Sequence, residues 1–215
     1  MFVKVCRPQP FLVNGANFAL ASILNDISDV ELKHLIAHYG RPKKLTFKAD
    51  FQDFECELIR DSQQKGRLHD VTCFIQHQDN GYVVIQKHQY GNSGIYRAPS
   101  GGSMSGESIE DAAIREMREE TGLEIKLVRF ILDLSLYIVC GSETIPWRSF
   151  VFLADIIRGE MKPLDTFEIF DVKVLTREQL LGDVDRLMKE SGWGGFNYRS
   201  FLTREFFKAL DELHI

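Results

Sequence analysis

The stretch that decides the fold runs from Gly101 to Leu123 and reads GGSMSGESIEDAAIREMREETGL. Three of its glutamates, Glu116, Glu119 and Glu120, are spaced so that they share one face of a helix. Carboxylates held that close repel one another unless a cation lies among them. The spacing therefore predicts a site for a hard divalent metal ion.

Local signals predict where this helix begins and ends. Ser108 followed by Asp111 forms a capping-box pattern, which places the helix start at Ser108. Apolar residues recur at every fourth position and give the helix a stripe that can pack on a core. Gly122 readily adopts the left-handed conformation found after helices, so the helix is expected to end near Thr121.

The segment ahead of the helix, Ala98 to Gly102, reads APSGG. A pair of glycines at the entry to a helix lets the backbone approach an anionic ligand, because no Cβ stands in the way. Oxygen-only ligands suit Mg²⁺ or Mn²⁺, which bridge protein carboxylates to phosphates, whereas zinc takes His or Cys. We therefore expect a metal-assisted phosphate site.

This segment resembles the Nudix box, G-x5-E-x7-R-E-U-x-E-E-x-G-U, in which U is an aliphatic residue. Its fixed positions are matched by Gly101, Glu107, Arg115, Glu116, Glu119, Glu120 and Gly122, with Met117 and Leu123 at two U positions. A charged helix that merely faces solvent is the simpler alternative. It does not explain why Gly101 and Glu107 of the loop also match the motif at the required spacing from the helix. The resemblance implies an α+β fold, a Nudix-type α/β/α sandwich with a mixed β-sheet.

The resemblance also implies roles, position by position. The expected ligands of the Mg²⁺ or Mn²⁺ ions, and the expected catalytic carboxylates, are Glu116, Glu119 and Glu120, joined by the Gly101 carbonyl oxygen. Glu107 and Arg115 are expected to pair and hold the loop against the helix, since arginine forms planar pairs with carboxylates.

Further candidates lie outside the box. Glu168 and Asp171, near a late strand, are alternative sources of an additional catalytic carboxylate, and the sequence does not choose between them. Tyr96 and Arg97 precede the glycine loop and are candidate contacts to a base or a phosphate of the substrate. The segment from 193 to 196 is either a mobile aromatic lid or a turn into the last helix, and the turn is favoured.

These features predict a Mg²⁺-dependent hydrolase that cleaves a phosphoanhydride bond of a nucleoside diphosphate linked to another moiety. The alternative is a Nudix-fold module that binds such a metabolite, or regulates in response to it, without hydrolysis. The intact set of carboxylates favours the enzyme. Val139 stands about where ADP-ribose pyrophosphatases carry a proline, so the resemblance leaves the specific substrate open.

Composition bounds the remaining possibilities. The 215 residues are 44% hydrophobic and 27% charged, as expected for one globular domain with an extension. A net charge of −5 argues against nucleic-acid binding and leaves a small nucleotide as the expected partner. We also expect a homodimer.

The sequence shows neither a membrane span nor a signal peptide, so we expect a cytoplasmic protein. The four scattered cysteines predict reduced thiols and no disulfide framework.

The chain divides by pattern into an N-terminal α+β extension, residues 1–65, and a Nudix domain, residues 66–215. In the extension we expect a helix at 28–39, strands at 45–48 and 50–60, and a polar linker at 62–66. In the domain we expect, besides the box helix, strands at 71–76, 82–87, 95–98, 124–139, 149–157 and 171–175 and helices from 176 and at 200–213. The extension is a recognition element, an exchanged arm or a packing layer. We expect burial against the catalytic unit or a partner subunit for its apolar residues Phe47, Phe51, Phe54 and Leu58.

Overall fold

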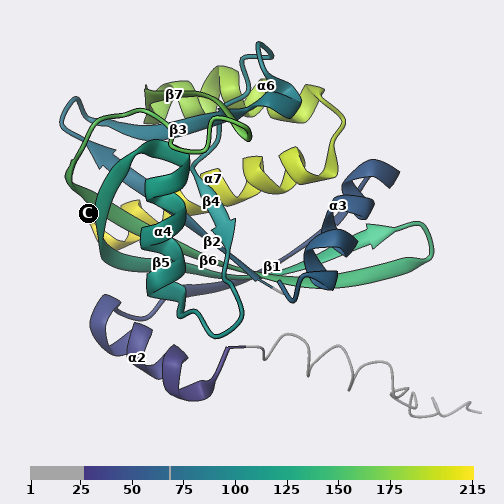
Figure 1. Ribbon diagram of the computed structural model, residues 1–215, viewed down its shortest axis with the longest axis horizontal. Helices are drawn as coiled ribbons and strands as arrows, with labels where there is room; N and C mark the ends of the chain where they lie inside the picture. Colours follow the sequence, from purple (N-terminus) through teal and green to yellow (C-terminus); the bar gives the residue numbers. More distant parts are fainter. Residues whose placement is uncertain (1–26, 68) are drawn as a thin grey trace, which may run out of the picture.

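The computed structural model describes residues 27–67 and 69–215, which form a mixed sheet with helices on both faces (Figure 1). The strands of the described part are β1 (Lys43–Asp50), β2 (His69–His77), β3 (Gly81–Lys87), β4 (Ser100–Gly102), β5 (Leu123–Cys140), β6 (Glu143–Gly159) and β7 (Ile169–Thr176). Cys6 and the N-terminal segment to which the signal-peptide prediction refers lie outside the described residues.

The strand order of the sheet is β1-β5-β6-β2-β3-β7, with β4 paired to β2. The long strands β5 and β6 form an antiparallel hairpin, while β1 runs parallel to β5 and β2 runs parallel to β6. The pairs β2–β3 and β3–β7 are antiparallel. The sheet is therefore mixed, as the sequence predicts.

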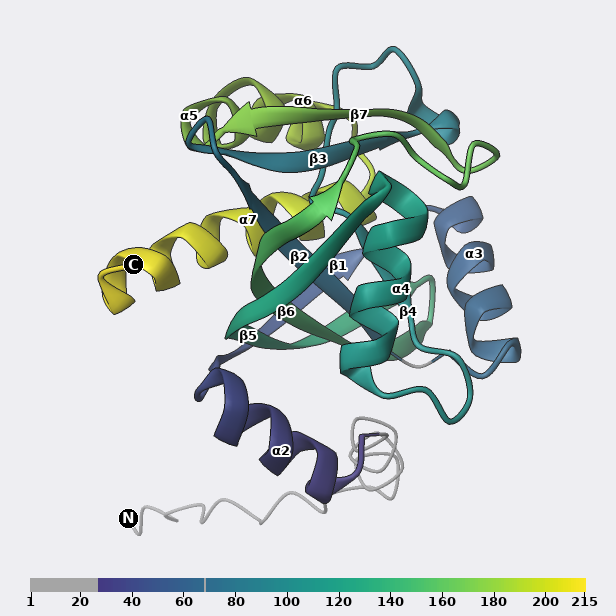
Figure 2. The same ribbon diagram turned by 60° about the vertical axis from the view of Figure 1, so that its left-hand side comes forward.

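The helices are divided between the two faces. One face carries α2 (Asp29–Tyr39) and α4 (Ile109–Thr121), whose buried residues share one apolar cluster. The other face carries α3 (Asp53–Gln64), η2 (Leu180–Val184), α6 (Asp185–Glu190) and α7 (Gly194–Leu213). Two short helical segments, η1 (His88–Tyr90) and α5 (Arg177–Gln179), are the remaining ones among the described residues. Figure 2 shows α4 and α7 on opposite sides of the sheet, which confirms the predicted α/β/α sandwich.

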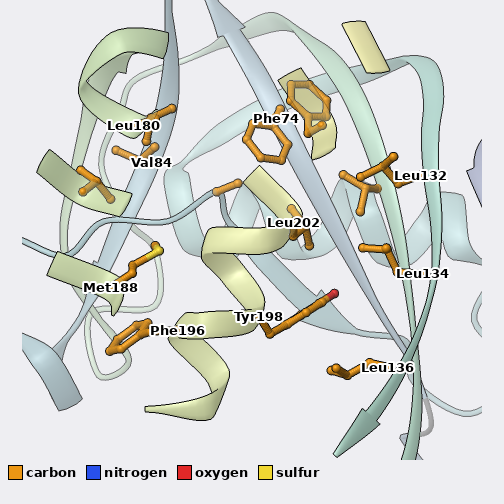
Figure 3. Packing of buried hydrophobic residues seen from close by; sticks show 14 of the residues in the cluster. Phe74, Val84, Leu132, Leu134, Leu136, Leu180, Met188, Phe196, Tyr198 and Leu202 are labelled. Atoms are coloured by element: carbon orange, nitrogen blue, oxygen red, sulfur yellow. The ribbon is translucent and has the colours of Figure 1, made fainter. Parts of the chain in front are cut away.

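Alternation along the strands supplies both apolar clusters, because successive side chains of a strand point to opposite faces. In β2, Phe74 packs on the α7 side, whereas Cys73 and Ile75 pack on the α4 side. Leu132, Leu134 and Leu136 of β5 join Phe74 on the α7 side (Figure 3). The ring of Phe74 stacks on Phe206 of α7 with centroids 3.7 Å apart.

The box helix has the predicted ends. The Ser108 hydroxyl accepts a hydrogen bond from the Asp111 amide at 3.1 Å, which confirms the N-cap. Gly122 follows the helix with φ +77°, and a Cβ there would lie 2.2 Å from the Lys162 carbonyl oxygen. Glycine is therefore required at position 122 for its conformation and for its close contact.

Three predicted elements differ from the structure. Residues 53–64 form helix α3, where the sequence predicts a strand at 50–60 and a linker from residue 62, because Gln52 and Glu55 make a reciprocal capping box and helix-favouring residues follow. The last helix begins at Gly194 and not at residue 200, so the predicted turn at 193–196 is wrong for residues 194–196, which form the first turn of α7 after the N-cap Trp193. Residues 95–98 contribute a single bridge, from Arg97 to Ile85, in place of a strand.

The prediction that the cysteines are reduced thiols is wrong for two of them. Cys56 of α3 and Cys140 of β5 form a disulfide across 84 residues of sequence. The pairing depends on where α3 packs, so the spacing of cysteines along the chain gives no sign of it. Cys73 is free and buried in the core. Disulfides are typical of oxidising compartments, so this pair argues against the expected cytoplasmic location. The cytoplasmic location stays a prediction.

The extension is joined to the sheet through β1, which pairs along its whole length with β5. Phe47 stacks on Phe201 of α7 at 4.4 Å, and Phe51 also packs against the core. Leu58, however, is 49% exposed, so its predicted burial against the catalytic unit is wrong, and burial against a partner subunit stays a prediction. In the described ranges, no helix has the length and apolar character needed to cross a membrane. The domain boundary near residue 65 stays a prediction.

Candidate functional site

Arg115 connects the glycine loop to the box helix. Its Nε and Nη2 donate to the two carboxylate oxygens of Glu107, each at 2.8 Å, and Nη2 also donates to the Gly102 carbonyl at 3.1 Å. Its Nη1 donates to Glu116 at 2.8 Å and to Glu119 at 3.1 Å. The hydrogen bonds from Arg115 hold the pKa of Glu107 below its usual value. One guanidinium thus orders three carboxylates and the loop backbone.

Gly101 lies directly against Glu116. A Cβ at position 101 would be 1.9 Å from Glu116 Cδ, so a larger residue would displace the carboxylate. Burial raises the pKa of Glu116, and the nearby carboxylates raise it further. The hydrogen bond from Arg115 acts in the opposite direction, but the pKa stays above its usual value. The glycine is therefore needed for close contact between the loop and the glutamate.

Glu120 is the most buried glutamate of the box, at 3% exposure. Its carboxylate accepts a hydrogen bond from the Ser100 amide at 2.7 Å and lies 3.3 Å from Lys87 Nζ. Lys87 also pairs with Glu168. The structure therefore brings Glu168 to the box glutamates through a shared lysine.

Asp171 and Tyr96 pair with each other. The Tyr96 hydroxyl donates to Asp171 at 2.6 Å, and Lys173 lies 3.6 Å from the centre of the tyrosine ring. Burial, followed by this hydrogen bond, raises the pKa of Tyr96 to about 12. Asp171 is therefore paired with Tyr96, whereas Glu168 shares Lys87 with Glu120 of the box.

Arg97 is buried beneath the glycine loop. It donates to the Tyr90 hydroxyl at 3.1 Å and to the Ser100 hydroxyl at 2.7 Å, and it lies 3.8 Å from Glu120. Its guanidinium charge is therefore held beside the loop by hydrogen bonds on several sides.

A cleft of about 420 Å³ opens beside the loop. Ser100, Gly101 and Gly102 form its edge, and Lys87, Arg97 and Glu168 also line it. Tyr96, Asp171 and the three box glutamates are not among its lining residues. The cleft has a volume suited to a small-molecule ligand, and it lies next to the loop that holds the glutamates.

Lys87 and Arg199 are site residues that sequence reasoning missed. Arg199 of α7 donates to Thr72 and Ser100, both at 2.8 Å, and to Asp70 at 3.1 Å. Neither residue belongs to a motif, and both come to the loop from distant parts of the chain. The sequence signal that could have found Lys87 is its place at the end of a strand, where side chains of a sheet meet a loop.

The carboxylates suit a divalent ion in their chemistry, since they offer only oxygen and two of them are buried beside like charges. In the part of the chain that is described, however, no three His, Cys, Asp or Glu side chains are grouped as a metal site. The glutamate oxygens pair with Arg115, Lys87 and the Ser100 amide. Metal ligation by these residues therefore stays a prediction.

The family model of the NUDIX domain matches residues 67–192. Since this match covers more than half of the chain, the protein belongs to the Nudix family.

Relatives carry names that fit this assignment. The NAD-capped RNA hydrolase NudC of Vibrio vulnificus is 33% identical over 104 residues, which are 46% of this chain and 35% of the relative. The ADP-ribose pyrophosphatase of Methanocaldococcus jannaschii is 32% identical over 123 residues, 53% of this chain and 66% of the relative. A solved NUDIX hydrolase from Nitrosomonas europaea is 20% identical with a TM-score of 0.46, over 69% of this chain and 88% of that one. The chain thus spans about a third of the first relative and about two thirds of the second.

Proposed function

We propose that this protein is a pyrophosphohydrolase that uses Mg²⁺ or Mn²⁺ to cleave a phosphoanhydride bond of a nucleoside diphosphate linked to another moiety. The observation that carries the proposal is the hydrogen bond between Ser100 and Glu120. It fixes a buried carboxylate of the Nudix box to the backbone strand that forms the edge of the cleft. A diphosphate lying along that edge would be next to the carboxylates.

The residues that would hold the metal are Glu116, Glu119, Glu120 and the Gly101 carbonyl. A divalent ion bound there would lower the pKa of a water molecule and stabilise charge on the phosphate oxygens. Arg115 orients the carboxylates, because it bonds Glu107, Glu116 and Glu119 at once.

The remaining groups would act on the phosphates and the attacking water. Lys87 and Arg97 line the cleft beside the loop and would bind phosphate oxygens, with Tyr96 as a further candidate contact. Glu168 also lines the cleft and is our candidate for accepting a proton from the attacking water. Asp171 is the second candidate, and its pairing with Tyr96 disfavours it.

The names of the relatives support a dinucleotide-like substrate, since one is named for hydrolysis of NAD-capped RNA and the other for ADP-ribose. Both compounds contain a diphosphate between two organic groups. We therefore propose a nucleoside diphosphate derivative of this kind, acted on by a cytoplasmic homodimer. The sequence predicts that nucleic acid is not bound. Comparing the hydrolysis of free NAD with that of NAD-capped RNA would test this prediction.

The test is a screen of ADP-ribose, NADH, UDP-sugars and dinucleoside polyphosphates with Mg²⁺ or Mn²⁺, followed by chromatography of the products. We expect two phosphate-containing products from one of these compounds and none in EDTA. Tight binding of a compound without turnover in either metal would overturn the proposal in favour of the non-hydrolytic alternative.

A further inference from the structure

The cleft has two walls of different origin. The wall beside the box comes from the region that matches the family, residues 67–192, and includes Gly101 and Lys87. The facing wall comes from α3 and from the start of α7, segments that flank the matched region on both sides. In Figure 1, α3 lies beside the outer end of the β5–β6 hairpin. The second wall thus lies outside the segment that the family model matches, whereas the first lies within it.

The second wall is aromatic. Trp193 stacks on Phe196 with centroids 4.9 Å apart and planes 11° from parallel, and Phe54 of α3 meets Trp193 edge-on at 4.8 Å. Trp193 and Phe54 are half-buried and line the cleft, as does Leu58, which is largely exposed. Flat apolar surface therefore remains accessible inside the cleft, where a planar ligand could cover it.

This wall is fixed in place by three different contacts. The buried carboxylate of Glu55 accepts hydrogen bonds from the amides of Gly194 at 3.0 Å and Gly195 at 2.8 Å, which ties α3 to the first turn of α7. The disulfide from Cys56 ties α3 to β5, and Arg60 pairs with Glu143 at 2.9 Å. A wall held this firmly is preorganised for a ligand, which lowers the cost of ordering it on binding.

A basic residue lies where the two walls meet. Arg67 packs so close to Gly102 that a Cβ there would be 2.8 Å from Arg67 Cδ. It also lines the cleft, and in the chain it follows α3, which carries part of the aromatic wall. A phosphate bound at the loop would thus have this cation beside it.

We infer that the wall formed by Phe54 and Trp193, with the buried Phe196 behind the indole, is a subsite that binds the nucleobase of the substrate. The base stacks against the indole of Trp193, while Arg67 contacts the diphosphate that leads to the loop. Bases and aromatic side chains stack with little dependence on base identity, so purines and pyrimidines both bind. That the ligand's diphosphate lies at the glycine loop as part of a substrate rests on the proposed function. The stacking of a base on Trp193 does not depend on it.

Binding can be measured without catalysis. In EDTA, the full-length Trp147→Phe protein keeps Trp193 as its single tryptophan, since the chain has two. We expect ADP and UDP to quench its fluorescence and inorganic pyrophosphate to leave it unchanged. By calorimetry, Trp193→Ala is expected to bind ADP about tenfold to a hundredfold more weakly, the range for loss of one stacked base, while Trp193→Phe retains most of the affinity.

Phe201→Ala is the matched control. Phe201 lies on α7, about two turns after the N-cap Trp193, and stacks on Phe47, but it does not line the cleft. This variant is expected to be less stable and to bind ADP normally. Unchanged ADP affinity in Trp193→Ala, or an equal loss in Phe201→Ala, would show that the aromatic wall is only packing and would overturn the inference.

Turnover separates this inference from the proposed function. For a compound that is hydrolysed, Trp193→Ala should raise KM at least about tenfold and leave kcat nearly unchanged, the pattern of lost uniform binding. If no compound is hydrolysed but ADP still quenches Trp193, the subsite stands and the proposed enzyme fails. If hydrolysis occurs with a KM that is the same in Trp193→Ala, the enzyme stands and the subsite fails.

Discussion

The backbone amide of Ser100 donates a hydrogen bond to the carboxylate of Glu120 at 2.7 Å. This contact joins β4, at the edge of the cleft, to the last turn of α4. Because the donor belongs to the backbone, it persists whatever side chains surround it. Glu120 is therefore held at a fixed distance from the place where we propose that the diphosphate lies.

Glu120→Gln is expected to lower kcat at least about a hundredfold in Mg²⁺ and to leave the fold intact, since a preorganised charge commonly contributes about 3 kcal/mol to catalysis. The amide oxygen of glutamine can still accept from Ser100, so only the charge is lost. Kinetics with and without EDTA, beside circular dichroism, measure the two effects. Equal turnover of the wild-type protein in EDTA contradicts this prediction.

Arg115→Ala is expected to lower the free energy of unfolding by about 1–3 kcal/mol, because charged groups of Glu107 and Glu116 lose their donor. Arg115→Lys should recover little, since lysine cannot form the bidentate pair with Glu107. Urea denaturation measures both changes. Arg186→Ala, which removes an exposed ion pair with Glu190, is the control and should cost less than about 1 kcal/mol. A native melting temperature in Arg115→Ala would refute the assignment.

Gly101→Ala is expected to abolish activity while the protein stays folded, because its Cβ would lie 1.9 Å from Glu116 Cδ and displace that carboxylate. Gly182→Ala is the matched control, since a Cβ at position 182 meets nothing within 4 Å. Kinetics and thermal melting of the two variants make the comparison. Normal kcat in Gly101→Ala would mean that Glu116 can be moved without consequence.

Removing the disulfide with Cys140→Ser, or reducing it with dithiothreitol, is expected to lower the free energy of unfolding by about 2–4 kcal/mol, as is typical when a long loop is released. Both treatments should also raise KM, because α3 forms a wall of the cleft. Dithiothreitol added to a Cys56→Ser/Cys140→Ser protein controls for effects on other thiols. A wild-type protein whose stability does not respond to reductant would argue against the bond.

Asp185 predicts a pH dependence of stability. Burial acts to raise its pKa, but hydrogen bonds from Lys189 and Ser200 and the charge of Arg204 outweigh burial, so the pKa of Asp185 lies below its usual value. A carboxyl with a lowered folded-state pKa stabilises the protein above its unfolded pKa, about 3.9, and loses that contribution as the pH falls through the folded-state value.

Asp185→Asn should therefore reduce stability most at neutral pH, and its difference from the wild-type protein should shrink below about pH 4. Urea denaturation at several pH values measures this difference. Asp183→Asn is the control, because the side chain of Asp183 is 86% exposed and pairs with Arg186 at the surface. A difference that is constant across the pH range would contradict the assignment.

Sequence reasoning succeeded for elements that depend on contacts between residues close together in the sequence. Ser108 and Gly122 set the ends of the box helix through contacts within four residues, and strand-like runs predicted most strands of the sheet but not their order. It failed for α3, which lies largely in the predicted strand at 50–60, because the cap formed by Gln52 and Glu55 favours a helix. Of the late carboxylates, the sequence left two open, and the structure put Glu168 beside Lys87.

The sequence by itself thus determined the family, the box helix and the set of carboxylates, because each of these follows from spacing along one short segment. The tertiary structure decided what surrounds them. It brought Arg199 from α7 to Ser100, joined Cys56 to Cys140, and placed Trp193 opposite the glycine loop in one cleft. These relationships depend on how distant helices pack on the two faces of the sheet. Packing of that kind is set by the shape of the whole core, which no short segment records.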